Sequence, residues 1–333
     1  MRLHITNLYG ISGSSATSVA MHSVAKIASE FAQDAGLEVS IYKYPSRVDN
    51  DVELVKRLDG IMSPVSIGDI VILQLPTWND MRYEERLIDK LKNYQVKLIM
   101  FIHDVVPLQF DSGEENLRAV INLYNKADVL ILPSQKMYEC LKEHGLKVEK
   151  VCFQTIFDYP LDVGMERHTF QRKMIFTGSP DRFGFVNHYQ GKTPIVLYGK
   201  KAADPDSNTK CMGERIGVSL LSEMSEGGFG LVWAGDDQYA YYRLNLPFKA
   251  TTFLAAGNPL IVQKGIHVAD FVKEQEIGWE AESIEEADQL VQSLTEQQYR
   301  QTLDNVKRIQ FLITHGYYTR KVLTDAVILA LEK

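Results

Sequence analysis

The sequence predicts an α/β protein made of two doubly wound domains, each with a parallel sheet and helices on both faces. Three observations support this prediction. The chain has 333 residues, which exceeds what one hydrophobic core usually supports. Short valine- and isoleucine-rich runs alternate with segments of helical pattern. A segment with proline, glycine and charge, residues 159–170, separates two such series and is the predicted linker.

The first series begins with a short apolar strand at residues 3–6, followed by a loop to residue 15. Apolar residues at helical spacing then predict a helix over residues 17–35, and Gly36 ends it because glycine commonly follows a last turn. The other strands are apolar runs at residues 38–42, 69–75, 96–102 and 129–132. The other helices are predicted at residues 52–58, 83–93, 117–126 and 134–144.

The second series shows the same alternation. Its strands are predicted at residues 173–176, 195–198, 209–212, 229–233 and 260–262. Its helices are predicted at residues 219–224, 250–256, 285–294, 297–309 and 319–331. Residues 235–237 are predicted to form an acidic turn after the strand at 229–233.

Composition narrows the class of protein. The net charge of −7, without a basic tail or stripe, argues against a nucleic-acid partner. The three cysteines lack metal-ligand spacing, which favours a reducing cytoplasm over a disulfide framework. The N-terminus lacks the apolar core of a signal peptide, and no apolar run approaches the ~20 residues of a membrane span. We therefore expect a soluble, cytoplasmic protein.

The segment from Gly228 to Val262 predicts an anion site. Lys249 stands two residues after Pro247, at the head of a helix that Gly257 ends. A helix N-terminus offers unpaired N–H groups and the positive end of a dipole, which suits a diphosphate. Thr251 and Thr252 are expected to add hydroxyls on the same turn, and Lys249 adds a full charge.

This arrangement resembles the nucleotide-sugar site of GT-B glycosyltransferases, in which a P-x-K, helix, A-x-G-x-P run recurs. The resemblance implies two Rossmann-like domains that face each other across a cleft. The first domain would comprise residues 1–160, with residues 317–333 crossing back to it, and the second residues 171–316. The chain departs from the pattern at one point. Many GT-B enzymes hold the donor ribose with a glutamate on this helix, where Thr252 or Phe253 stands here.

The same resemblance brings three other segments to the donor site. The turn at residues 177–183 would face the diphosphate, and Arg182 would clamp it through two hydrogen bonds. The alternative is a surface arginine that pairs with Asp181. The loop before Thr17 would contact the donor phosphates or the acceptor, and its spacing is not that of a dehydrogenase. The nucleotide base would pack on a segment that is otherwise a plain loop, formed by Glu214, Arg215, Ile216 and Gly217.

His103 and Asp104 follow the predicted strand at residues 96–102, at the end where open α/β sheets bind ligands. Sugar transfer to a hydroxyl needs a group that accepts or orients its proton, and Asp104, with His103 beside it, is the candidate. The alternative is that Asp104 caps the next turn and His103 is an interior histidine. No metal-ligand spacing occurs, so we expect a metal-free reaction in which Arg182 and Lys249, both facing a wet cleft, neutralise the leaving UDP.

Six segments extend the resemblance over nearly the whole chain: HITN, FIHDVVPL, ADVLILPSQKM, GSPDRFGF, EMSEGGFGLVW and PFKATTFLAAGNPLIV. Together they resemble the accessory glucosyltransferases that glycosylate serine-rich repeat adhesins in streptococci and lactobacilli. The resemblance implies a homotetramer, with no cofactor, that adds a hexose, usually glucose from UDP-glucose, to N-acetylglucosamine on serine or threonine. Its UDP contacts would fall on Thr17, Arg182, residues 214–217, Pro247, Phe248, Lys249, Ala250, Thr251 and Thr252.

Two alternatives remain open at this point. One is a transferase that uses UDP-galactofuranose or UDP-N-acetylglucosamine to build a surface polysaccharide. The other is a non-catalytic GT-B subunit that stabilises a true transferase. The presence of both Arg182 and Lys249 argues against the second, because a scaffold does not require two diphosphate anchors.

Overall fold

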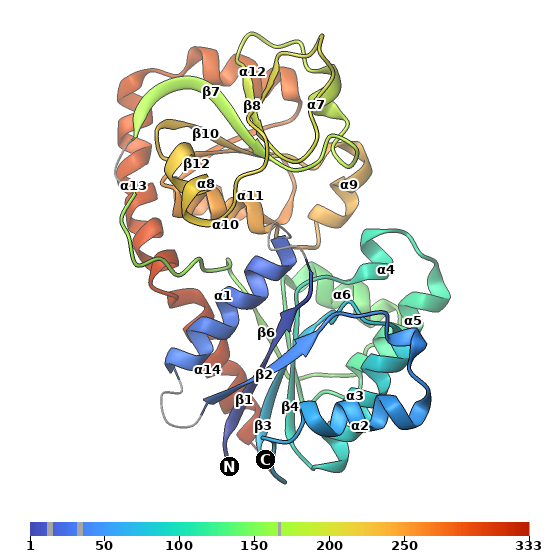
Figure 1. Cartoon of the computed structure of the whole chain (residues 1–333). Helices are drawn as coiled ribbons and strands as arrows, with labels where there is room; N and C mark the ends of the chain where they lie inside the picture. The colour runs from blue at the N-terminus through green and yellow to red at the C-terminus, as the bar shows by residue number, and fades with distance from the viewer. Residues whose placement is uncertain (12–15, 32–35, 166–167, 333) are drawn as a thin grey trace. The chain divides into compact units, whose positions relative to one another are not determined.

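The computed structural model describes residues 1–11, 16–31, 36–165 and 168–332. The chain forms two compact units, one of Met1–Thr155 with Gly316–Lys333 and one of Ile156–His315. Each unit contains a six-stranded parallel sheet with helices on its faces (Figure 1). The predicted fold class, α/β with two Rossmann-like doubly wound sheets, is confirmed.

The sheet of the first unit has the strand order β2-β1-β3-β4-β5-β6, and every neighbouring pair is parallel. Its strands are β1 (Leu3–Tyr9), β2 (Gly36–Tyr42), β3 (Ile70–Leu75), β4 (Lys97–Ile102), β5 (Val129–Leu132) and β6 (Val151–Phe153). Every residue of β3 and β5 is buried, which explains why β5 is a continuous apolar run and why β3 is apolar except for Gln74. The order reverses between β1 and β3, so the ligand-binding switch point of this sheet lies at their carboxyl ends.

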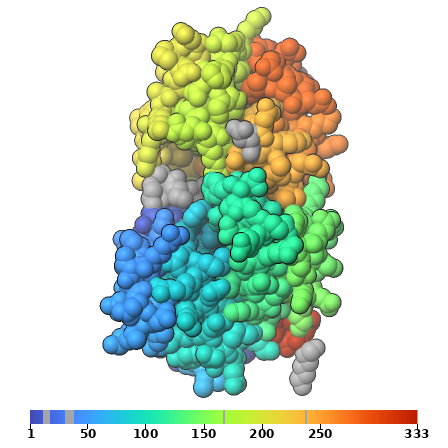
Figure 2. All heavy atoms as spheres, turned by 90° about the vertical axis from the view of Figure 1, so that its right-hand side faces the viewer, coloured from blue at the N-terminus to red at the C-terminus, as the bar shows by residue number. Residues whose placement is uncertain are grey.

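Helices cover both faces of this sheet. They are α1 (Ala16–Phe31), α2 (Asp51–Ile61), α3 (Met81–Asn93), α4 (Val106–Gln109), α5 (Glu114–Tyr124), α6 (Gln135–Glu143) and α14 (Tyr317–Leu331), with a short 3₁₀ turn at Ser46–Val48. Helices α1 and α14 lie on one face, whereas α2, α3 and α5 lie on the other (Figure 1). Figure 2 shows the surface on the side of α2 to α5. Asn50, Asp80 and Ser134 cap α2, α3 and α6 through side-chain oxygens.

The sheet of the second unit has the order β12-β11-β10-β7-β8-β9, again all parallel. Its strands are β7 (Thr169–Thr177), β8 (Ile195–Tyr198), β9 (Thr209–Cys211), β10 (Gly227–Val232), β11 (Leu260–Gln263) and β12 (Gly278–Ala281). Its helices are α7 (Phe185–His188), α8 (Gly217–Met224), α9 (Gly235–Tyr242), α10 (Phe248–Ala255), α11 (His267–Glu274), α12 (Ile284–Ser293) and α13 (Glu296–Thr314). Its switch point lies between β7 and β10, so the segments after these strands are placed for ligand binding.

The structure differs from the predicted elements at several places. Gly36 begins β2, where it pairs with Leu3, and the predicted last turn of the first helix, residues 32–35, lies outside the described residues. The predicted turn at residues 235–237 is the start of α9, and β7 begins at Thr169, inside the predicted linker. Elements α4, β6, α7, α11 and β12 were not predicted, because short or half-polar segments carry too little periodicity. Every helix within the described ranges is too short or too polar to cross a bilayer.

Gly316 is a position where the fold requires glycine. Its φ is +73°, and an added Cβ would lie 2.9 Å from the side chain of Ile27 on α1. Gly316→Ala should therefore lower the free energy of unfolding by at least ~1–2 kcal/mol, the cost of a left-handed backbone with a side chain. Gly60 is the matched control, because it lies in α2 and an added Cβ would meet nothing within 4 Å. Gly60→Ala should raise stability by ~0.5–1 kcal/mol in the same urea titration, and equal effects at both glycines would contradict this account.

Candidate functional site

Helix α10 is the structural base of the predicted anion site. Pro247 is its N-cap and makes no side-chain cap bond, so the first turn lacks a side-chain cap, although the Ala250 N–H donates to the Pro247 carbonyl at 3.2 Å. Seven of its eight residues are buried, including Phe248 and Ala250. Lys249 is the exception, because the residue as a whole is partly exposed. The uncapped turn and Lys249 are thus what α10 offers to an anion.

The two threonines of α10 differ from the prediction. The Thr251 hydroxyl donates a hydrogen bond of 3.0 Å to the Phe157 carbonyl, and Thr251 is fully buried. The Thr252 hydroxyl donates to the Phe248 carbonyl, one turn earlier, at 3.2 Å. Both hydroxyl protons are therefore used inside the second unit, where they anchor the helix and do not point to a ligand.

The amino group of Lys249 is sheltered, which corrects the expectation that it faces a wet cleft. Its Nζ lies 3.3 Å from the ring centroid of Phe183 and 4.1 Å from that of Phe176. Nζ is buried and has no hydrogen-bond partner among the described residues. Burial holds the pKa of this amine well below its usual range, and the Arg182 guanidinium lowers it further.

Arg182 lies in the turn that follows β7. Its Nη2 donates to Gln238 Oε1 on α9 at 2.9 Å, and its guanidinium lies 5.4 Å from the Phe183 ring centroid. Asp181, the alternative partner, instead forms an ion pair with Lys201. The structure thus brings Arg182 and Lys249 to the same aromatic ring, at the carboxyl end of β7.

Gly178 makes this arrangement of the turn possible. An added Cβ would lie 3.0 Å from the Phe183 ring and 3.1 Å from the Phe176 ring. Those two rings meet edge to face, with centroids 5.2 Å apart. Neither phenylalanine could be selected from the sequence, because an apolar ring in or next to a strand has the pattern of an ordinary core residue.

The predicted base-binding segment is an exposed loop between β9 and α8. Arg215 Nε donates to Glu223 at 2.7 Å, and Glu214 lies 3.5 Å from Lys200, so both charges have partners within the loop region. Ile216 is 55% exposed although it is apolar. Gly217 begins α8 with φ +57°. Thr17 lies in α1, but its side chain is outside the described part of the structure.

His103 is an interior histidine of the first unit. Gln74 donates from Nε2 to the carbonyls of Thr6 and Met21, so its Oε1 accepts, and His103 Nε2 donates to that oxygen at 2.8 Å. The imidazole also stacks on Phe101, with centroids 4.7 Å apart. Burial lowers the pKa of His103 to about 3, so the ring is neutral at pH 7.

Asp104 is half-exposed and precedes α4. The N-cap of α4 is Val105, which makes no side-chain cap bond, so Asp104 does not occupy the cap position that the alternative interpretation gave it. The Asp104 charge acts on Tyr124, whose pKa is raised by burial first, then by Glu84 and Asp104. A half-exposed carboxylate at the carboxyl end of β4 is accessible to a hydroxyl in solution.

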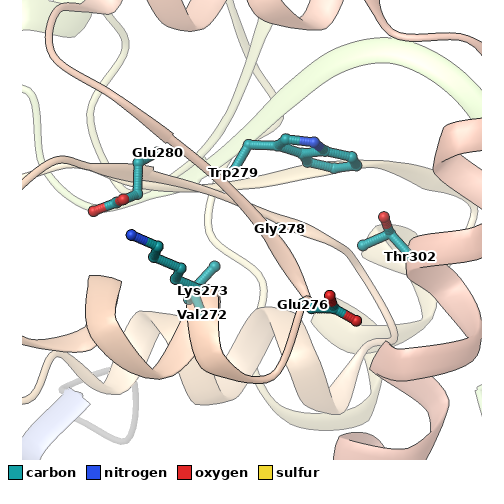
Figure 3. A pocket seen from close by; sticks show the side chains of 7 residues that line it. All are labelled: Val272, Lys273, Glu276, Gly278, Trp279, Glu280 and Thr302. Atoms are coloured by element: carbon teal, nitrogen blue, oxygen red, sulfur yellow. The ribbon is translucent and has the colours of Figure 1, made fainter.

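A pocket of about 270 Å³ lies elsewhere in the second unit, at the edge strand β12 (Figure 3). It is lined by Val272, Lys273, Glu276, Gly278, Trp279, Glu280 and Thr302. None of the predicted site residues belongs to it. Across the described ranges, no three His, Cys, Asp or Glu side chains lie close enough to hold a metal ion.

Comparison with known proteins gives a consistent result. The N-terminal domain of the glucosyltransferase 3-like family matches residues 2–156, and the C-terminal domain of that family matches residues 174–326. Glucosyltransferase 3 of Streptococcus gordonii is 39% identical over 98% of this chain and 99% of its own. Glucosyltransferase 3 of Streptococcus parasanguinis is 38% identical over 99% of each chain. The β-1,6-galactofuranosyltransferase WbbI of Escherichia coli K12 is 25% identical over 84% of each chain.

Solved structures with little sequence identity share the fold. Anabaena HepE in complex with UDP has a TM-score of 0.68 at 13% identity and covers 98% of this chain and 100% of its own. The lipopolysaccharide galactosyltransferase WaaB has a TM-score of 0.60 at 12% identity, over 99% of this chain and 100% of its own. These structures support the GT-B fold.

Thr251→Val tests the structural role of this hydroxyl. The change keeps the volume but removes the buried hydrogen bond to the Phe157 carbonyl, so the free energy of unfolding should fall by ~1–3 kcal/mol. Thr251→Ser, which keeps the hydroxyl, is the control in the same denaturant titration. Unchanged stability of the valine variant would show that the hydroxyl is free to serve a ligand instead.

The depressed pKa of His103 predicts a pH dependence of stability. The unfolded imidazole binds a proton below its ordinary pKa of about 6.5, whereas the folded one stays neutral to about 3. Stability should therefore fall by up to ~1.4 kcal/mol per pH unit as the pH drops from about 6.5 towards 3. His103→Gln should show a shallower loss in urea titrations between pH 6.5 and 4. Parallel curves for the two proteins would contradict a buried, neutral His103.

Proposed function

This chain belongs to the glucosyltransferase 3-like family, and we propose that it transfers glucose from UDP-glucose to N-acetylglucosamine already attached to serine or threonine of a serine-rich repeat adhesin. The full-length relatives at 38–39% identity, both named glucosyltransferase 3, support the hexose transfer. Anabaena HepE has been solved in complex with UDP, with UDP and glucose, and with UDP-glucose, which supports the donor class. The acceptor rests on the sequence resemblance alone.

One observation carries the donor side of this proposal. Two basic side chains, Arg182 and Lys249, converge on the Phe183 ring at the carboxyl end of β7, in the unit whose helix α10 begins with an uncapped turn. Positive charge and free N–H groups at a switch point suit a diphosphate. In the proposed reaction these groups bind the donor and stabilise the UDP that leaves, so no metal ion is required for charge neutralisation.

The missing glutamate on α10 has a consequence for donor recognition. Neither Phe253 nor Thr252 has a carboxylate that could bind the ribose hydroxyls. Phe253 is fully buried, and Thr252 is 8% exposed. The proposal therefore places most of the donor binding energy on the diphosphate groups and on the loop at residues 214–217. The exposed apolar side chain of Ile216 in that loop suits contact with the face of a nucleobase.

On the acceptor side, the proposal assigns Asp104 to the hydroxyl that attacks the sugar. Its carboxylate would accept or orient the proton of that hydroxyl. His103 would act only by fixing the backbone at the end of β4 through Gln74, because a neutral, buried imidazole neither donates charge nor reaches a substrate. The homotetramer that the sequence resemblance implies stays a prediction.

A second candidate is supported by the relative WbbI, a galactofuranosyltransferase of 25% identity. Under that alternative the donor is UDP-galactofuranose. A transfer assay with a panel of UDP-sugars and an N-acetylglucosamine-modified serine peptide discriminates between them. We expect glucose to be transferred from UDP-glucose, with the same rate in EDTA. Transfer of another sugar alone would favour the second candidate, and complete loss on chelation would contradict the metal-free reaction.

Asp104→Asn tests the acceptor-side assignment. The variant should bind UDP nearly as well as the parent protein, because Asp104 is not assigned to the donor, while transfer falls by ~10²-fold or more. Calorimetry with UDP and the peptide assay measure the two quantities. Asp111 serves as a control, because its carboxylate lies in the exposed segment that follows α4, and Asp111→Asn should leave both unchanged. Normal transfer by Asp104→Asn would place the base elsewhere.

A further inference from the structure

We propose that the Lys249 amino group is uncharged in the free protein and takes up a proton when the diphosphate of a sugar donor binds, and that Phe183 is the positioning residue that holds it in this state. The inference rests on the proposed function, since it concerns the same donor site. The inference goes beyond the proposed function because it assigns different protonation states to the Lys249 amine in the free and the donor-bound protein.

The side chain of Lys249 has an unusual orientation. A lysine at a protein surface normally buries its methylene stem and keeps its charged end in water. Here the residue as a whole is partly exposed, yet the Nζ atom is buried. It lies 3.3 Å from the Phe183 ring centroid and 4.1 Å from that of Phe176. The amino group is therefore turned inward, onto two aromatic rings.

A positive charge on the buried Nζ atom of Lys249 is energetically costly. An ammonium ion removed from water needs hydrogen-bond acceptors or an opposite charge, and the described residues offer Nζ neither. The ring faces of Phe176 and Phe183 offset only part of this cost. The charged group that acts on the amine among the described residues is Arg182, which repels a second positive charge. The neutral amine is the form that this environment stabilises.

Binding of a diphosphate changes the environment of the Lys249 amine. The diphosphate of a UDP-sugar carries two negative charges and does not titrate near neutral pH. Nζ is too deeply buried to contact it without moving outward. An outward amine beside an anion is stabilised as the ammonium, so the neutral amine gains one proton from solvent, and no other bond changes. The bound state then pairs Lys249 and Arg182 with one diphosphate.

The sign of the pH dependence follows from these two states. The pKa of the amine is depressed in the free protein and raised again by the anion in the complex. Between those two pKa values, binding consumes a proton, so the Kd for UDP-glucose should rise with pH by up to tenfold per unit. Below the free-state pKa the amine is already charged, and the dependence should disappear.

Calorimetry of the full-length protein with UDP-glucose at pH 8.5, in buffers of low and high ionisation enthalpy, measures the proton directly. UDP-glucose is the probe because, unlike UDP, it has no phosphate group that titrates near this pH. We expect the wild type to take up protons on binding, at most one per site, and Lys249→Met to take up none. Binding by the wild type without buffer dependence would overturn this inference and leave the proposed function standing. Absence of binding under all conditions would overturn both.

The role of Phe183 has its own matched pair of variants. Phe183→Leu removes the ring in contact with Nζ and admits water, so the proton uptake should fall and the Kd should become less dependent on pH. Phe185→Leu is the control, because Phe185 packs on Phe176 with centroids 5.0 Å apart, whereas the Lys249 amino group lies against Phe176 and Phe183. If Phe183→Leu does not fold, Phe183→Met replaces it. Equal proton uptake by the Phe183 variant and the control would show that the ring does not set the state of the amine.

Discussion

The close approach of α10 to β10 determines where the basic groups of the second unit lie. Gly230 of β10 makes this approach possible, because an added Cβ would lie 2.4 Å from the Phe253 side chain of α10. The Thr251 hydroxyl holds the same helix to the Phe157 carbonyl. Because α10 is held in this position, Lys249 in its first turn lies at the end of β7. Its amino group lies against the rings of Phe176 and Phe183.

The packing of α10 on β10 thus determines where the site of the second unit lies. The chemistry of the site depends on the polar groups that this packing brings together. An uncapped helix N-terminus, a guanidinium held by Gln238 and a buried amine all lie beside one switch point of a parallel sheet. The buried Lys249 amine, which has no hydrogen-bond partner among the described residues, is costly without an anion. In the first unit, Gln74 bonds His103, Thr6 and Met21 in one network. The amine of Lys249, which has no hydrogen-bond partner among the described residues, supports a donor site in the second unit.

The sequence predicted the fold class, most strands, and the positions of Lys249 and Arg182, because alternating patterns and the lysine at a helix start depend on nearby residues. It did not predict the roles of Thr251 and Thr252. The partner of Thr251 is a backbone carbonyl 94 residues away, which leaves no mark in the side-chain pattern. The sequence analysis also predicted that the Lys249 amine faces solvent, because lysine is rarely buried. Only the three-dimensional arrangement shows that Gly178 leaves room for two rings beside it.

The most direct test of this account is a crystal structure of the protein with UDP bound. The account predicts that the diphosphate lies at the start of α10, within hydrogen-bond distance of Arg182 and of a Lys249 amine that has left the Phe183 ring. A diphosphate bound elsewhere, for example in the pocket beside Trp279, or a Lys249 amine that remains against the ring while UDP is bound, would contradict it.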